Sequence, residues 1–214
     1  VNGAFFSKPD LINSYVAGFI ASDGSIGSVE GRNSYETRWT LNKRDLEHLD
    51  LVARVVGFTG KPYCSNTRSE VTLSIRSQQW VQDLGKNFNI FPNKSLNLEP
   101  PELNAKNSLS YIVGYIDGDG SIMYRKDERP ALGIVGTENI LKWIRGLFNE
   151  ISPPLKSSIG SVTKFKHSDA FHYNLSGRRV VDIIKTLHSI NTPKLKRKWE
   201  GETIQKILSW EPKR

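Results

Sequence analysis

Two stretches of the sequence match each other, "VAGFIASDGS" at residues 16–25 and "IVGYIDGDGS" at residues 112–121. Both are apolar, contain several small residues and end in Asp-Gly, and their alignment places Asp23 over Asp119. Similarity within one chain at a long spacing is the signature of a repeated structural unit. The pair therefore predicts that the chain contains two copies of one unit.

A second match supports the duplication. "NIFPNKSL" at residues 89–96 aligns with "SINTPKLK" at residues 189–196 at nearly the same spacing, with Lys94 over Lys194. Between the copies, the paired prolines of "NLEPPELNAKN" are typical of a linker. We predict an N-terminal subdomain at residues 1–98, a linker at residues 99–107 and a C-terminal subdomain at residues 108–214.

Composition and charge narrow the class of protein. A chain of 214 residues with 37% hydrophobic residues is globular and can hold two small domains. Its formal charge of +8 favours a polyanionic partner, nucleic acid before a membrane surface. The single cysteine, Cys64, excludes an intramolecular disulfide and fits a reducing intracellular compartment. No apolar run approaches the roughly twenty residues of a membrane span, so we expect no membrane partner.

The hydrophobic pattern predicts the same order of elements in both halves: an apolar helix, two strands, a helix, two strands and a helix. Apolar and polar side chains alternate in "TRWTLN", "EVTLSIR" and "FHYNLS", which indicates antiparallel sheets with one face in water. The fold class is therefore α+β. The helices that we expect span residues 11–22, 45–56, 78–87, 108–118, 138–151, 178–189 and 195–210.

The polar faces of these strands carry Arg, Asn, Thr, Ser and His, which hydrogen-bond base edges and phosphates. Basic stretches, "YRKDER" and "KFKH", adjoin them. In a chain of net positive charge, this pattern favours a sheet that reads nucleic acid over an ordinary solvated face. The predicted DNA-binding residues are Arg38, Thr40, Asn42, Arg68, Thr72, Ser74, Arg76, Arg125, Lys126, Lys164, Lys166, His172 and Asn174.

Small residues recur one helical turn apart in the two matching stretches, Gly18 with Ser22 and Gly114 with Gly118. Such a stripe removes side-chain bulk and lets two helix backbones approach closely. Glycine costs about 1 kcal/mol in a helix interior, which indicates a packing need. We therefore expect the two helices to pack against each other.

Both helices are expected to end at Asp-Gly, with Gly24 and Gly120 in the left-handed conformation that terminates helices. If the helices pair about a pseudo-twofold axis, Asp23 and Asp119 come together at their ends. Two close carboxylates repel each other, and a divalent cation between them relieves the repulsion. Oxygen ligands suit Mg²⁺, and metal ions held by carboxylates can stabilise the attacking and leaving oxygens in phosphodiester hydrolysis.

Residues 16–24 and 112–120 resemble the two copies of the motif that defines the single-chain LAGLIDADG homing endonucleases, and the resemblance covers essentially the whole chain. It implies two pseudo-twofold-related αββαββα subdomains, with the motif helices at the centre and saddle-shaped sheets in the DNA major groove. It also implies a monomer that binds a long double-stranded target and cleaves both strands with Mg²⁺, leaving 3′ overhangs, in intron homing. Mn²⁺ or Ca²⁺ is expected to substitute in binding.

The resemblance also assigns site residues. Asp23 and Asp119 stand at the family's metal-binding position, and Ser22 and Gly118 are expected to complete the metal ligands. Family active sites carry a peripheral basic residue in each half that positions water or stabilises the charged transition state. The expected catalytic residues are Asp23, Asp119, Lys94 and Lys194, with Lys196 as an alternative to Lys194.

One motif position departs from the family pattern. The sixth residue, usually Asp, is Asp117 in the second copy and Ala21 in the first. Because this position is not the family's metal ligand, we expect the change to alter local packing or capping without abolishing cleavage.

Two other functions remain open on the same fold. Some family members are maturases that bind their intron RNA and assist splicing, and a DNA-binding protein without nuclease activity is the second alternative. Retention of Asp23 and Asp119 favours the nuclease. The host compartment is expected to be a mitochondrion, a chloroplast or a prokaryotic cytoplasm.

Overall fold

A computed structural model describes residues 1–28, 35–94, 97–154 and 160–212. The first half contains α1 (Leu11–Asp23), β1 (Gly24–Ser28), β2 (Tyr35–Asn42), the short 3-10 helix η1 (Lys43–Asp45), α2 (Leu46–Val55), β3 (Tyr63–Cys64), β4 (Glu70–Arg76) and α3 (Gln78–Phe88). The second half contains α4 (Ala105–Asp119), β5 (Gly120–Tyr124), β6 (Pro130–Gly136), α5 (Glu138–Ile151), β7 (Val162–Lys164), β8 (Phe171–Ser176), α6 (Arg178–Ser189), α7 (Lys196–Trp199) and α8 (Glu202–Leu208). Two αββαββα units follow each other, which confirms the predicted α+β fold.

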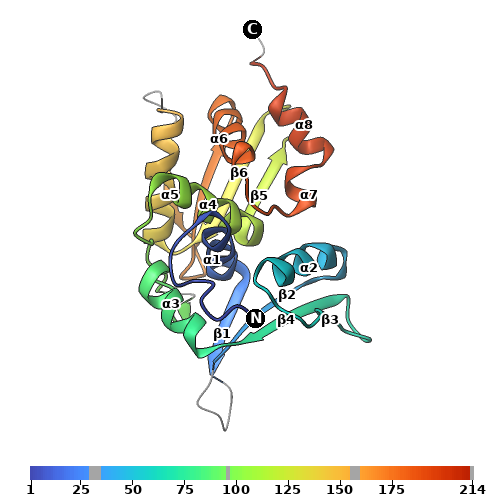
Figure 1. Ribbon diagram of the computed structural model, residues 1–214. Helices are drawn as coiled ribbons and strands as arrows, with labels where there is room; N and C mark the ends of the chain where they lie inside the picture. The colour runs from blue at the N-terminus through green and yellow to red at the C-terminus, as the bar shows by residue number, and fades with distance from the viewer. Residues whose placement is uncertain (29–34, 95–96, 155–159, 213–214) are drawn as a thin grey trace.

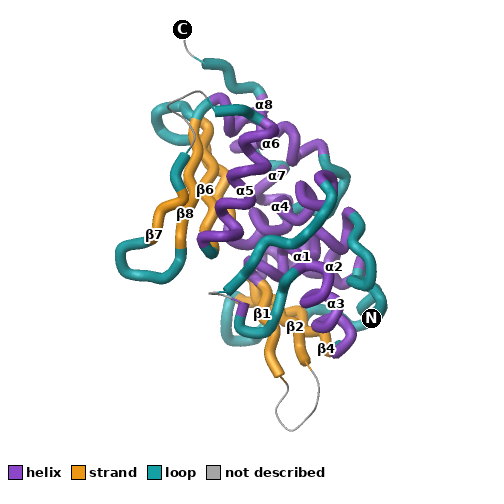
Figure 2. Tube along the Cα trace, turned by 90° about the vertical axis from the view of Figure 1, so that its left-hand side faces the viewer, coloured by secondary structure: helices purple, strands orange, loops and turns teal. Residues whose placement is uncertain are grey.

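Each half forms one four-stranded antiparallel sheet. The strand orders are β1-β2-β4-β3 and β5-β6-β8-β7, so the two sheets have the same topology. Figure 1 shows α1 and α4 side by side between the two sheets. In Figure 2 the strands β6, β7 and β8 lie at the left and β1, β2 and β4 lie at the bottom, with the motif helices between these two groups. This arrangement leaves one face of each sheet free of helices.

The motif helices α1 and α4 form the most extensive helix contact of the described chain. A Cβ atom on Gly18 would lie 1.9 Å from the carbonyl oxygen of Tyr111, and one on Gly114 would lie 2.0 Å from that of Tyr15. Real Cβ atoms do not approach so closely, so only glycine fits at these two crossings. The packing of the small-residue stripes against each other is thereby confirmed.

The ends of the motif helices differ from the prediction. Gly24 (φ −82°, ψ 154°) and Gly120 (φ −96°, ψ 151°) are extended, so the expected left-handed caps were wrong. Each helix passes directly into the first strand of its sheet. A Cβ atom would lie 2.8 Å from the Cα of Ile20 at the first glycine and 2.7 Å from the Cα of Ile116 at the second. Glycine is required here by a close approach to the helix.

The C-terminal helix is also different from the prediction. Residues 195–210 form two short helices, α7 and α8, because the chain leaves the helical conformation at Glu200 and Gly201. Trp199, Ile204 and Ile207 are buried, as the apolar stripe of the sequence indicates. Helix α4 begins at Ala105, inside the stretch predicted as the linker. Within the described residues no helix is long and apolar enough to cross a membrane.

Candidate active site and nucleic-acid interface

The carboxylates of Asp23 and Asp119 lie at the adjoining C-terminal ends of α1 and α4. A Cβ atom on Gly118 would lie 2.1 Å from Ser22 Oγ and 2.9 Å from the Cβ of Asp23, so the two helix ends are in contact. Both aspartates remain exposed to solvent. The structure thus brings together the two acids that the sequence places at equivalent positions, and leaves them accessible to a ligand.

At each of the two aspartates, some neighbouring groups raise the pKa of the carboxyl and others lower it. The pKa of each carboxyl is raised, chiefly because the neighbouring helix ends partly shield it from water, and the charge of Asp23 raises that of Asp119 further. Lys94 and Lys198 lower both, and Arg197 also lowers that of Asp23. The site therefore holds two mutually repelling acids between two lysines.

The two carboxylates form a small oxygen donor set. Among the described residues, no group of three or more His, Cys, Asp or Glu side chains could hold a metal ion. Mg²⁺ often takes only one or two carboxylates from the protein and completes its shell with water and phosphate oxygens. Asp23 and Asp119 fit such an ion, because a cation would relieve the repulsion between them. Metal binding by these residues and by Ser22 and Gly118 stays a prediction.

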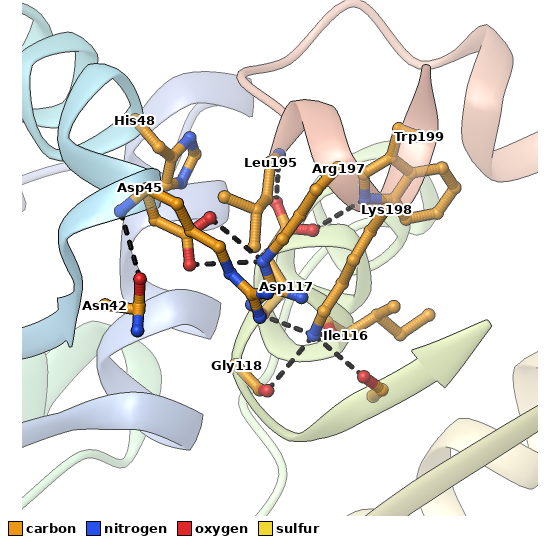
Figure 3. Close-up of polar contacts among 12 residues, drawn as sticks. Asn42, Asp45, His48, Ile116, Asp117, Gly118, Leu195, Arg197, Lys198 and Trp199 are labelled. Carbon is orange, nitrogen blue, oxygen red and sulfur yellow. Dashed lines mark hydrogen bonds and ion pairs between the residues drawn. The ribbon is translucent and has the colours of Figure 1, made fainter. Parts of the chain in front are cut away.

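Two lysines bind the backbone at the ends of the motif helices. Lys94 is buried, and its ammonium donates to the carbonyl oxygen of Ala21 at 2.8 Å and to that of Ser22 at 3.4 Å. Lys198 donates to the carbonyl oxygens of Asp117 at 2.7 Å and Gly118 at 3.2 Å, the equivalent pair in the second copy (Figure 3). Burial lowers the pKa of each lysine to about 8.

This geometry corrects the expected pairing of Lys94 with Lys194. The ammonium of Lys194 donates to the carbonyl oxygen of Ile190 and not to a motif carbonyl. Lys196, the alternative, forms an exposed ion pair with Glu47 at 2.6 Å. Both line a pocket of about 470 Å³ between α2 and the segment before α7. In the second half, Lys198 makes the backbone contacts that match those of Lys94.

Asp117 ties the C-terminal segment to the motif helices. Its buried carboxylate accepts hydrogen bonds from Tyr15 Oη at 2.6 Å, the Leu195 amide at 2.8 Å and Trp199 Nε1 at 2.6 Å. Burial raises the pKa of this carboxyl and the three hydrogen bonds oppose the rise, so that the resulting pKa is about 6. Because Leu195 and Trp199 flank Lys198 in the chain, these bonds hold the lysine over the end of α4 (Figure 3). The first copy has Ala21 instead of this acid.

Tyr15 extends this network into the first half. Its hydroxyl also lies 2.8 Å from Nε2 of the buried His48, on α2. Nearby, Arg197 Nε donates to both carboxylate oxygens of the buried Asp45, at 2.9 and 3.1 Å. Arg197 thus links α7 of the C-terminal half to η1 of the N-terminal half, and Tyr15 links α1 to α2, both beside the candidate active site.

The helix-free face of the N-terminal sheet carries most of the predicted DNA-binding residues of that half. The residues whose side chains share this face are Arg38, Thr40 and Asn42 on β2 and Thr72, Ser74 and Arg76 on β4. Arg68 lies in the exposed loop before β4, within 3.8 Å of Glu70. Glu36 was missed by the sequence analysis. It shares the face and pairs with both Arg38 and Arg76.

The C-terminal sheet presents only some of the residues that were predicted to read DNA. His172 and Asn174 share its helix-free face, while Arg125, Lys126 and Lys166 lie in exposed turns at the ends of its strands. The expected place of Lys164 on this face was wrong. It pairs with Phe171 on the core side of the ladder, and its ammonium binds Asp169 at 2.8 Å.

Solved structures with a similar fold are LAGLIDADG homing endonucleases. I-LtrWI bound to its target DNA matches with a TM-score of 0.57, 13% identity and coverage of 91% of this chain and 86% of that one. I-SmaMI bound to cleaved DNA matches with a TM-score of 0.55 and 14% identity, over 89% of this chain and 86% of that one. I-SmaMI bound to uncleaved DNA in the presence of calcium ions matches with a TM-score of 0.54 and 15% identity, over 88% of this chain and 87% of that one. No protein-family model and no curated protein matches the sequence. The chain therefore has the LAGLIDADG homing endonuclease fold, which confirms the resemblance of its two motifs at the level of structure.

Proposed function

We propose that the protein is a sequence-specific endonuclease that hydrolyses both strands of double-stranded DNA with the help of a divalent cation, in the manner of intron homing enzymes. The observation that carries this proposal is the pair of exposed carboxylates, Asp23 and Asp119, at the contact of two duplicated helices. Asp23 directly precedes β1 and Asp119 directly precedes β5, so each carboxylate lies where a motif helix passes into its sheet. The DNA-bound neighbours of the same fold support the substrate class.

Asp23 and Asp119 would hold the cation, for which Mg²⁺ is the expected ion. When bound, such an ion supplies charge stabilisation for the oxygens of the scissile phosphate. Lys94 and Lys198 would also contribute charge stabilisation, because they place positive charge beside the carboxylates. A cation held in advance where negative charge develops stabilises the transition state without reorganisation. The pseudo-symmetry provides one such lysine for each strand, which fits cleavage of both strands by a monomer.

The test is plasmid cleavage at a target site selected from random duplexes. We expect the wild-type protein to linearise the plasmid with Mg²⁺ and to leave it intact in EDTA. Asp119→Asn should abolish linearisation while binding to the site survives, because the change keeps size and removes one charge. Asp50→Asn, on α2 and away from the motif helices, is the matched control and should cleave like the wild type.

Other outcomes of this test would identify other functions. Tight binding to the site without cleavage in Mg²⁺ or Mn²⁺ would identify a DNA-binding protein that lacks nuclease activity. Stimulated splicing of an intron transcript would establish a maturase, with intron RNA as partner.

A further inference from the structure

The two sheets can be compared position by position, because their ladders have the same register relative to the motif. Gly24 pairs with Trp39 and Gly120 pairs with Ile134, so these two strand residues are equivalent. Trp39 pairs in turn with Leu73, and Ile134 with Tyr173. The equivalence fixes which side chains occupy the same place on the two helix-free faces.

Three charged side chains lie together on the N-terminal face, near the start of β2 and the end of β4. Arg38 and Arg76 both bind the carboxylate of Glu36, the latter at 3.2 Å, and both arginines are more than half exposed. Arginine bonds guanine in the major groove, and a carboxylate accepts from the amino group of cytosine. This charged cluster is therefore suited to G·C pairs.

The equivalent places on the C-terminal face are uncharged. The residue equivalent to Glu36 is Ala131, the one equivalent to Arg38 is Gly133, and the one equivalent to Arg76 is Ser176. Two further positions are apolar and exposed on this sheet only. Val135, 37% exposed, replaces Thr40, and Met123, 44% exposed, replaces Gly27. The C-terminal face therefore lacks the three charges of the N-terminal face and exposes two larger apolar side chains instead.

The C-terminal face also keeps one amide free to read a base. Asn174 is exposed, and no hydrogen bond to its side chain is seen in the part of the chain that the structure describes. A Cβ atom on Gly133 would lie 2.9 Å from Asn174 Oδ1, so a larger residue at position 133 would clash with this amide in its present position. One hollow of about 410 Å³ on this face is lined by Asn174, Met123, Ala131 and Ser176, with the charged Arg125 at its border.

The charges of this half lie at the rim of the sheet. Arg125, Lys126 and Arg129 are exposed in the turn between β5 and β6, and Lys166 is exposed in the turn between β7 and β8. Basic residues around an uncharged face match a duplex, whose phosphates flank a groove of base edges. This complementarity favours DNA over an apolar protein surface as the occupant of the face.

We propose that the C-terminal sheet reads an A·T-rich half-site, in which thymine methyl groups contact Met123 and Val135 and an adenine is bonded by Asn174. The chemistry follows from the major groove, where thymine presents a methyl group to apolar side chains and adenine presents a donor and an acceptor to an asparagine amide. The N-terminal sheet reads the half-site that contains G·C pairs. This inference rests on the proposed function, and it adds the composition of each half of the target.

The first experiment is selection of bound duplexes from a random pool in the absence of Mg²⁺, followed by replacement of thymine with deoxyuridine in one half-site at a time. Deoxyuridine lacks only the methyl group. Each contacted methyl that is removed should weaken binding about fourfold, as expected for burial of one apolar carbon. The same replacement in the other half should leave the affinity within twofold.

The second experiment assigns the sensitive half to the C-terminal sheet. In the Met123→Ala/Val135→Ala double variant, whose two side chains are exposed and can be shortened without a cavity in the core, deoxyuridine should no longer weaken binding. Arg38→Ala is the matched change on the other sheet. It should relax the preference for G·C in its own half and keep the full response to deoxyuridine.

Two results would overturn the inference while leaving the proposed function intact: equal or absent deoxyuridine effects in the two halves, or a persisting effect in the double variant. Binding of an apolar protein face in place of DNA at Met123 and Val135 would overturn it as well. If selection yields no bound duplex at all, DNA binding itself fails, which is a distinguishable result.

Discussion

Lys94 and Lys198 occupy equivalent places in the two halves, each with its ammonium on the two backbone carbonyls that precede a motif aspartate. They reach these places from different local structures, since Lys94 lies in the loop after α3 and Lys198 lies on α7. The two motif ends therefore have equivalent lysine contacts, although the sequence alignment does not place these two lysines at equivalent positions.

The first prediction concerns the lysine of the second half. Lys198→Met should lower the rate of plasmid cleavage roughly 100-fold, because it removes a cation placed where negative charge develops. Lys194→Met removes a lysine four residues earlier, whose ammonium donates to the Ile190 carbonyl and to no motif carbonyl among the described residues, and should change the rate less than threefold. The measurement is the single-turnover cleavage rate at saturating enzyme.

Binding to the target, measured without Mg²⁺, serves as the control for both lysine variants and should change by less than fivefold. Loss of cleavage in Lys194→Met together with full activity in Lys198→Met would contradict the assignment.

The sequence predicted the elements of the fold well where local patterns decide them. Alternation in "TRWTLN" and "EVTLSIR" located two strands, and the repeated Asp-Gly located the paired helix ends. The lysine of the second half that contacts the motif carbonyls was not predictable in this way. The stretch "KLKRKW" offers four basic residues on adjoining positions, and only the contacts of Asp117 with Leu195 and Trp199 decide which one faces the motif.

The second prediction concerns the helix crossing. Gly18→Ala would place a methyl group 1.9 Å from the carbonyl oxygen of Tyr111, in backbone that cannot move without separating the helices. We expect it to lower the free energy of unfolding by at least about 2 kcal/mol. Gly146→Ala in α5 is the matched control, because a Cβ atom there meets nothing within 4 Å. It should raise the free energy of unfolding by about 0.5–1 kcal/mol through helix propensity.

Urea denaturation of the two alanine variants checks this prediction. Similar stabilities would show that α1 and α4 do not cross as closely as the structure describes.

The third prediction concerns the buried carboxylate at the sixth motif position. Asp117→Asn keeps the size of the side chain but turns an amide donor toward one of three existing donors, those of Tyr15, Leu195 and Trp199. We expect a loss of about 2–4 kcal/mol in the free energy of unfolding. Asp127→Asn, which removes an exposed acid within 3.5–3.6 Å of two arginines, should cost at most about 0.5 kcal/mol.

Chemical denaturation at pH 7 gives both values. An Asp117→Asn protein as stable as Asp127→Asn would mean that the carboxylate does not hold the C-terminal segment.

The surroundings of the sixth motif position, Asp117 in the second copy and Ala21 in the first, could not be predicted from the sequence. The buried partner of Asp117 is Tyr15 of the other motif helix, and Tyr15 in turn contacts His48. These three residues are far apart in the chain, and no local periodicity connects them. The predicted place of Lys164 on the helix-free face was wrong for a related reason. The register of β7 against β8 decides which face of the sheet its side chain lies on, and this register depends on long-range pairing.

The last prediction concerns the pH dependence of stability. Burial lowers the pKa of His48 to about 4, against about 6.5 in the unfolded chain. Asp45 raises this pKa, while Arg197 and Lys198 lower it, and Tyr15 Oη contacts Nε2. Between pH 6.5 and pH 4 the unfolded state therefore binds a proton that the folded state does not. The folded state loses stability as the pH falls through this range, by up to about 3 kcal/mol.

His48→Gln isolates this effect, because glutamine does not titrate and can still bond the Tyr15 hydroxyl. Asp117 acts in the opposite direction, since its pKa is raised to about 6 and its cost is relieved on acidification, but it is present in both proteins and cancels in their difference. Urea denaturation at pH 7, 6, 5 and 4 should show wild type losing stability relative to His48→Gln at each step below pH 6.5. The exposed His167→Gln is the matched control and should follow wild type. Parallel curves for wild type and His48→Gln would show that His48 is not held neutral by its buried position.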